Sequence, residues 1–207
     1  MKMVLAELLG TTLYLLALVN PVSKVLVLAS VEPALSWPQL RSVALRSTRA
    51  ALLIVWSLAI AGNFLLRVVF HVDLYSLRIA GGIVLFIVGL NAVRQGRFFE
   101  AVGAPSADDI SIIPLAAPLI AGPGTITAAI SYAALSGIPF TLLCLGLALL
   151  ANLGFMLAAL PLHRLLERLH ATGPLIRITG LIVMAVAVQM TLAGCSEWLL
   201  RTLAASH

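Results

Sequence analysis

The sequence predicts an all-α integral membrane protein whose six transmembrane helices form two inverted three-helix repeats. The first indication is composition: 61% of the 207 residues are hydrophobic and only 10% are charged, whereas about 25% of a soluble domain is charged. The mean hydropathy is +1.10. The second indication is a series of apolar segments of membrane-spanning length, and the third is an internal repeat. Because little sequence remains outside the apolar segments, residues 1–207 are expected to form one transmembrane domain.

Six apolar segments follow one another, separated by short polar stretches. Since about 20 residues cross the hydrocarbon of a bilayer, the first segment is too long for one straight crossing and predicts a tilt or a break. No small-residue cleavage site follows the amino terminus, so it is expected to be a first span rather than a removed signal peptide. Ser36, ahead of Trp37 and Pro38, predicts an N-cap with proline in the first helical turn. The segments cover roughly residues 3–31, 43–66, 76–93, 112–135, 140–162 and 176–200.

The chain repeats itself. Residues 71–84 align without a gap with residues 170–183, so that His71 matches His170, and nearly the same offset brings Pro21 onto Pro123. Repeat one therefore covers about residues 1–100 and repeat two about residues 101–207. A unit with three spans must enter the membrane inverted the second time. Inverted repeats with helices interrupted by proline or glycine at corresponding positions are typical of secondary transporters.

The basic residues indicate an orientation in the membrane. The formal net charge of +5 is better explained by basic residues that flank spans than by binding of nucleic acid. Eight basic residues on one side against four on the other predict that both termini lie outside the cytoplasm, in the periplasm. The first set is Arg41, Arg46, Arg49, Arg94, Arg97, Arg164, Arg168 and Arg177, and the second is Lys2, Arg67, Arg78 and Arg201.

Two interrupted helices predict the binding site. Unwound backbone at membrane depth survives only where it is buried in protein or lines a wet cavity. At each break the first half-helix presents carbonyl groups that suit an ammonium group or Na⁺, and the second presents N–H groups that suit a carboxylate. Facing breaks would therefore bind a small zwitterion, although a proline in a membrane helix is also often only a kink. The candidate substrate-binding residues are Asn20, Pro21, Ser23, Gly122, Pro123, Gly124, Thr125 and Thr127.

Other polar residues in the spans carry weaker signals. Lys24, the ion-coupling candidate, has two open interpretations: it snorkels to the headgroups as an interfacial anchor, or its ammonium stands in the cavity where a coupling cation would bind. Asn91 and Gln189 are candidates for lining the cavity or for bonding between helices. We expect no metal site, because His163 and His170 beside Glu167 lack a further ligand. No cofactor motif and no catalytic set are visible.

The motifs resemble those of the MarC family of multi-pass inner-membrane proteins. The resemblance rests on "PLAAPLIAGPGTIT" (114–127), "RIAGGIVLF" (78–86) and "VQMTLAG" (188–194). It implies a location in the bacterial inner membrane, a first and a fourth helix broken at the substrate site, and transport of small neutral amino acids such as alanine or glycine with Na⁺ or H⁺. At its first break the chain departs from the family pattern, with Ser23 for a glycine, Leu26 for a proline, Leu28 for an aromatic residue and a charge at Lys24.

The sequence thus favours a secondary transporter that works by alternating access around the paired breaks, with the lipid bilayer and a small solute as its partners. The alternative is a membrane protein that keeps the fold with an altered site, as a channel or as a non-transporting assembly partner. An enzyme is disfavoured because the spans lack a cluster of residues suited to catalysis. The oligomeric state and the direction of transport are left open by the sequence.

Overall fold

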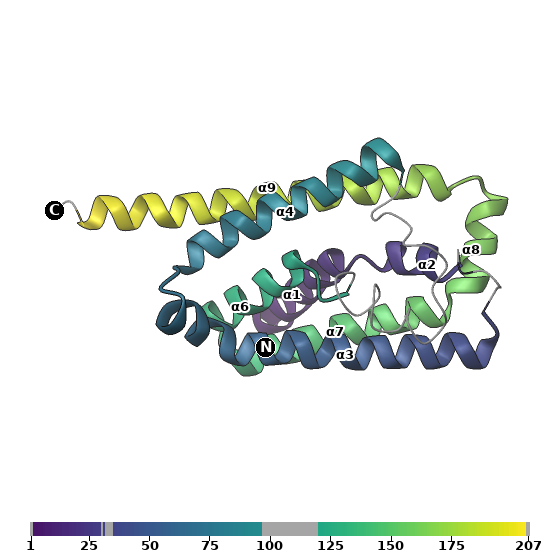
Figure 1. Cartoon of the computed structure of the whole chain (residues 1–207), viewed down its shortest axis with the longest axis horizontal. Helices are drawn as coiled ribbons and strands as arrows, with labels where there is room; N and C mark the ends of the chain where they lie inside the picture. The colour runs from purple at the N-terminus through teal and green to yellow at the C-terminus, as the bar shows by residue number, and fades with distance from the viewer. Residues whose placement is uncertain (1, 30, 32–34, 97–119, 206–207) are drawn as a thin grey trace.

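The computed structural model describes residues 2–29, 31, 35–96 and 120–205, and all regular elements within these ranges are helices. Figure 1 shows their arrangement. The elements are α1 (Lys2–Val19), α2 (Pro21–Ala29), α3 (Trp37–Phe64), the π-helical turn η1 (Leu65–Val69), α4 (Leu74–Gln95), α6 (Pro123–Leu135), α7 (Ile138–Leu157), α8 (Ala159–Arg168) and α9 (Thr172–Ala205).

The helices confirm an all-α protein of the membrane-spanning type. Within the described ranges, five helical stretches are long and apolar enough to cross a membrane. The fourth predicted segment, 112–135, is described only from Ile120 onward, and its described part contains α6. The arrangement as six spans in two inverted repeats therefore stays a prediction. The five stretches are Val4–Ala29, Trp37–Val69, Leu74–Gln95, Ile138–Leu157 and Thr172–Ala204.

The predicted N-cap is confirmed at one helix, and a predicted segment needs correction at another. Helix α3 begins at Trp37 with Ser36 as its N-cap and proline in the first turn, as expected. The predicted segment 140–162 is instead divided, because α7 ends at Leu157 and α8 begins at Ala159. Proline in a helix cannot donate to the carbonyl four residues earlier. Pro161 thus leaves the Leu157 carbonyl without its helical donor, which explains the end of α7.

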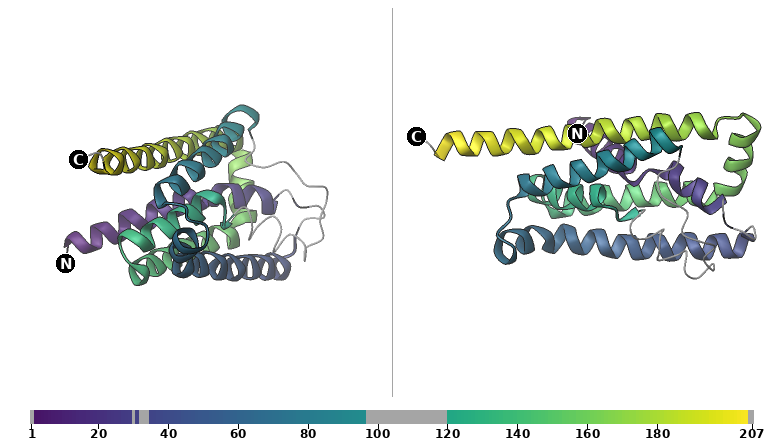
Figure 2. Two further views of the ribbon diagram at one scale, coloured as in Figure 1. Left: turned by 60° about the vertical axis from the view of Figure 1, so that its left-hand side comes forward. Right: turned by 45° about the horizontal axis from the view of Figure 1, so that its top comes forward.

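The helices form three layers, which Figures 1 and 2 show from different sides. Helices α4 and α9 lie side by side in one outer layer, and α3 and α7 pack together in the other. Between these layers lie α1, α2 and α6, of which α6 contacts both α3 and α4. The three helices that begin or end at the predicted breaks therefore lie between the two outer layers, and irregular backbone in a membrane needs such cover by protein.

Small residues allow α4 and α9 to approach closely. A Cβ atom at Gly89 would stand 2.8 Å from the backbone oxygen of Gly180, and one at Gly82 would stand 2.8 Å from the backbone oxygen of Ala187. Gly82 and Gly89 are seven residues apart, as are Gly180 and Ala187, so small side chains return to the contact every two turns. Close packing of backbones at small residues is a main source of helix association in membranes.

The two histidines aligned in the sequence repeat have the same backbone conformation. His71 has a φ of 52° and His170 a φ of 51°, and each lies in the short turn before a long helix, α4 or α9. A positive φ is uncommon for residues other than glycine. Its occurrence at both aligned positions indicates that the turn is built in the same way in each half of the chain.

Candidate functional site

The first predicted break is present and lies at Asn20. This residue has a φ of 56°, in the left-handed region that asparagine tolerates better than most residues. Its own N–H donates to the oxygen of Leu16 at 2.9 Å and closes α1. Its side chain starts α2, because the N–H of Ser23 donates to Asn20 Oδ1 at 3.4 Å and Ser23 Oγ donates to the Asn20 carbonyl at 2.8 Å. The beginning of α2 is therefore capped from within the chain.

The side chain of Lys24 turns back towards this break. Its Nζ donates to the carbonyl of Val19, the last residue of α1, and to Ser23 Oγ at 3.3 Å. Lys24 is only 1% exposed, so its ammonium lies inside the protein at this break. A cation in the first turn of α2 is unfavourable for the dipole of that helix, but the carbonyl end of α1 favours it. Since a charge at membrane depth costs roughly 3 kcal/mol or more, this contact at the end of α1 offsets part of a large penalty.

Of the second predicted break, the structure describes the start of α6, and the half-helix expected before it lies largely outside the described residues. The N-cap of α6 is Gly122, whose backbone is extended at φ −79° and ψ 170° and which has no side chain to cap the helix. The first helical hydrogen bond runs from the N–H of Ile126 to the Gly122 carbonyl at 2.9 Å. The amides of Gly124 and Thr125 therefore have no acceptor within α6. Among the described residues no side chain caps this helix end, and a helix N-terminus of this kind is suited to bind an anion.

The structure brings the two breaks together. A Cβ atom added to Gly124 would stand 3.4 Å from Cδ2 of Leu18, which lies two residues before Asn20, and 2.9 Å from Cδ1 of Leu85 on α4. The absence of a side chain at Gly124 thus lets the start of α6 approach the end of α1. Thr125, the next residue in the chain, is buried.

Three other candidate residues lie elsewhere. Thr127 is buried with its hydroxyl against Gly81, at the contact of α6 with α4, so it packs between helices rather than beside a break. Gln189 is exposed in the single chain, and its predicted role in lining a cavity or in bonding between helices stays a prediction. Ala187 faces α4, and a residue two positions further along a helix points to the opposite side. Asn91 is half-buried on α4.

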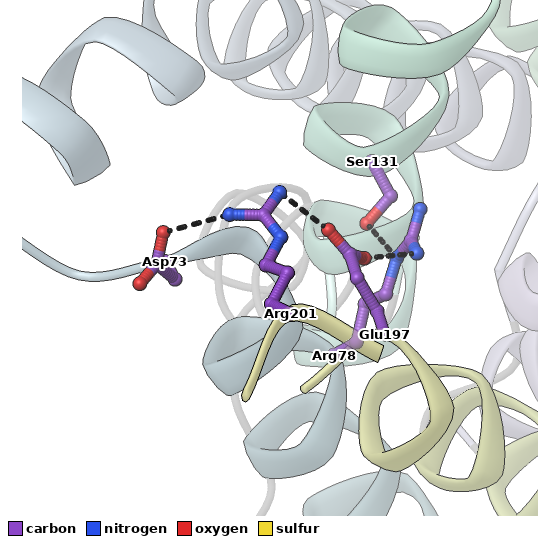
Figure 3. Close-up of polar contacts among 5 residues, drawn as sticks. All are labelled: Asp73, Arg78, Ser131, Glu197 and Arg201. Atoms are coloured by element: carbon purple, nitrogen blue, oxygen red, sulfur yellow. Dashed lines mark hydrogen bonds and ion pairs between the residues drawn. The ribbon is translucent and has the colours of Figure 1, made fainter. Parts of the chain in front are cut away.

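A polar network that the sequence did not predict joins α4, α6 and α9 (Figure 3). On α4, Arg78 donates from Nε to Ser131 Oγ of α6 at 3.2 Å and forms an ion pair with Glu197 of α9 at 2.9 Å. The side chains of Arg78 and Glu197 are 12% and 24% exposed. Arg201 binds the other oxygen of Glu197 at 2.8 Å and reaches Asp73 at 3.3 Å. One carboxylate therefore holds two guanidinium groups, and α6 is tied to the α4–α9 pair.

Replacement of Glu197 by alanine is expected to destabilise the protein by about 1–2 kcal/mol. Removal of one partner from a fully buried ion pair costs about 3–5 kcal/mol, and the partial exposure of this pair reduces the effect. The free energy of unfolding in detergent micelles, measured by denaturant titration, checks this. Glu167→Ala is the matched control, because Glu167 is 62% exposed in its i,i+4 pair with His163. Equal losses of stability in the two variants would contradict the prediction.

Among the residues that the structure describes, no group of three or more metal-ligating side chains comes together. His163 contacts Glu167 at 3.1 Å, and these two residues give only two ligands. Most zinc sites need three or four protein ligands. The chemistry around the breaks is therefore that of helix ends, hydroxyl groups and one ammonium group.

The chain is similar to membrane proteins of bacteria and archaea. Residues 5–199 match the family described as MarC family integral membrane protein. A UPF0056 membrane protein of Pyrococcus horikoshii is 33% identical, over 92% of this chain and 94% of the relative. One of Aquifex aeolicus is 32% identical, over 90% of this chain and 91% of the relative. The UPF0056 inner membrane protein YhgN of Escherichia coli is 28% identical, over 93% and 98%. No solved structure matches the chain.

Proposed function

Because this chain belongs to the MarC family of integral membrane proteins, we propose that it is a secondary transporter of small zwitterionic solutes, such as alanine and glycine. The observation that carries the proposal is the approach of the two helix breaks, where Gly124 at the start of α6 packs against Leu18 at the end of α1. Interrupted helices that meet inside a helical bundle are the usual substrate sites of such transporters.

The chemistry of the breaks favours a substrate with a carboxylate. The open N-terminus of α6 offers the amides of Gly124 and Thr125 and the positive end of a helix dipole, both of which bind anions. The hydroxyl group of Thr125 lies on the same turn. The substrate is small, because Leu18 and Leu85 lie against Gly124 and leave little space there for a long side chain.

The chain is a multi-pass integral membrane protein, and the similar protein YhgN is named as an inner membrane protein. We propose that this chain also lies in a bacterial inner membrane, with both termini outside the cytoplasm. Two inverted three-helix repeats would then carry the two breaks to the same depth. Two observations support this arrangement. His71 and His170 have nearly the same φ angle, and α3 packs against α7 as α4 packs against α9.

Uptake into proteoliposomes tests the proposal. We expect the reconstituted protein to accumulate labelled alanine, glycine and serine with saturation, and to exchange labelled for unlabelled substrate in counterflow. An excess of unlabelled glycine should compete with labelled alanine, whereas leucine should not, because of the limited space beside Gly124. Proteoliposomes without protein give the background. Uptake equal to this background for all three amino acids would refute transport of this substrate class.

The altered first break favours one second candidate function, that of a non-transporting membrane protein which keeps the fold. The carbonyl of Val19 at the end of α1 is already bound by the ammonium of Lys24, so part of the site is occupied by the chain itself. The same assay separates the candidates. A channel gives flux without saturation or counterflow, and an assembly partner gives no flux.

A further inference from the structure

The carbonyl end of α1 is the part of the site where a cation is favoured. Proline at position 21 has no N–H, so the carbonyl four residues earlier has no donor in the continuing chain. The N–H of Ser23, which would bond to Val19 in an unbroken helix, is directed to Asn20 Oδ1 instead. Half-helix ends and unwound carbonyls of this kind bind Na⁺ in transporters with broken helices.

At this helix end the chain supplies its own cation. The ammonium of Lys24 donates to Val19 O and to Ser23 Oγ, and the Asn20 carbonyl accepts from the same hydroxyl. These groups are oxygen ligands of the type that hard cations prefer. Lys24, Ser23 and Asn20 are all buried, so the ammonium stands inside the protein rather than in solvent.

We propose that the ammonium of Lys24 is a tethered substitute for Na⁺, which occupies the cation position at the end of α1 and makes the protein independent of Na⁺. The inference rests on the proposed function, because it names the ion that this transporter does without. A cation held by the chain leaves no place for Na⁺ at Val19 O. It also supplies a positive charge that can attract the carboxylate of a zwitterion in each transport cycle.

Removal of the ammonium should open this position to Na⁺. In wild-type proteoliposomes we expect equal alanine uptake in NaCl and in choline chloride. In Lys24→Ala we expect uptake to be at least about fivefold higher in NaCl, since couplings between binding sites are commonly of this size or larger. Lys24→Met is the first matched control, because its side chain fills the same space without charge and should show no Na⁺ stimulation. Leu28→Ala is the second, because Leu28 is equally buried one turn along α2.

Thermal unfolding of the purified proteins in the same two salts tests the cation position without transport. NaCl should raise the melting temperature of Lys24→Ala over that in choline chloride, and should leave wild type, Lys24→Met and Leu28→Ala unchanged. Absence of uptake in every variant together with this melting pattern would refute the proposed transport and retain the inference. If Lys24→Ala is folded in NaCl but unfolded in choline chloride, the variant needs Na⁺ to fold, and this result also supports the inference.

Two outcomes would overturn the inference. One is stimulation of wild-type uptake by Na⁺, or stabilisation of the wild-type protein by Na⁺, which would show that the ion binds with Lys24 in place. The other is a folded Lys24→Ala variant that is indifferent to Na⁺ in both measurements. If Lys24→Ala folds in neither salt, Lys24→Ser is tested in its place. If Lys24→Ser does not fold either, the response of the wild-type protein to Na⁺ decides the question.

Discussion

Alanine uptake by Pro123→Ala is expected to be at least about tenfold below that of the wild-type protein. Loss of a charge-assisted hydrogen bond to a substrate carboxylate costs about 1.5–3 kcal/mol, which corresponds to a factor of roughly 10 to 150. Alanine restores the missing N–H and removes the clash that keeps the residue before a proline out of the helical conformation. Gly122 can then join α6, so that the Thr125 amide bonds to the Ala121 carbonyl and the set of open amides moves one residue towards the N-terminus.

The substitution should leave membrane insertion intact, because insertion depends on summed hydropathy. Initial rates of uptake at equal amounts of reconstituted protein measure the effect. Pro174→Ala is the matched control, since Pro174 is exposed in the first turn of α9, away from both breaks. Gly124→Ala is less suitable, because its new Cβ atom would also press on Leu85 at 2.9 Å. Wild-type rates in Pro123→Ala would refute a role of the open α6 terminus in binding.

The protein with Gly89→Ala is expected to be less stable than wild type by about 1–3 kcal/mol, the usual effect of forcing an extra carbon atom into a packed interior. The new Cβ atom would stand 2.8 Å from the backbone oxygen of Gly180 and 3.0 Å from the backbone nitrogen of Met184. Backbone atoms cannot rotate away as the end of a side chain can. The whole of α4 must therefore move away from α9.

Denaturant titration in mixed micelles measures this loss of stability. Gly154→Ala is the matched control, because Gly154 lies within α7 and a Cβ atom there would meet nothing within 4 Å. That variant should be as stable as wild type or slightly more stable, since alanine favours the helix over glycine by about 0.5–1 kcal/mol. If Gly89→Ala unfolds at the same denaturant concentration as Gly154→Ala, the close contact does not stabilise the fold.

The membrane class and the first break could be predicted from local sequence alone. Apolar segments of spanning length carry their own signal, and proline at position 21 removes a hydrogen bond wherever its helix packs. The division of the segment 140–162 between α7 and α8 was missed, although Pro161 marks it. The apolar composition of residues 140–162 predicts one continuous span, because composition alone does not show where a helix ends.

The directions of the polar side chains could not be predicted. Lys24 is long enough to reach either the headgroups or the break, and only the packing of α2 decides between them. The pair of Arg78 and Glu197 joins residues 119 positions apart, so its formation depends on the antiparallel alignment of α4 with α9. The polarity of Gln189 is consistent with lining a cavity or with bonding between helices, whereas the face that α9 turns towards α4 is set by the small residues.

The seven-residue spacing of small residues between α4 and α9 also determines how the molecule can move. The close approach of the backbones at Gly82, Gly89 and Gly180 packs α4 tightly against α9, although the two helices come from different halves of the sequence. In the proposed transporter, we expect a motion that opens the breaks to alternate sides to move α4 and α9 together and to separate layers of the fold rather than its repeats. The hinges of such a motion then fall in the turns at His71 and His170, where α4 and α9 join the rest of the chain.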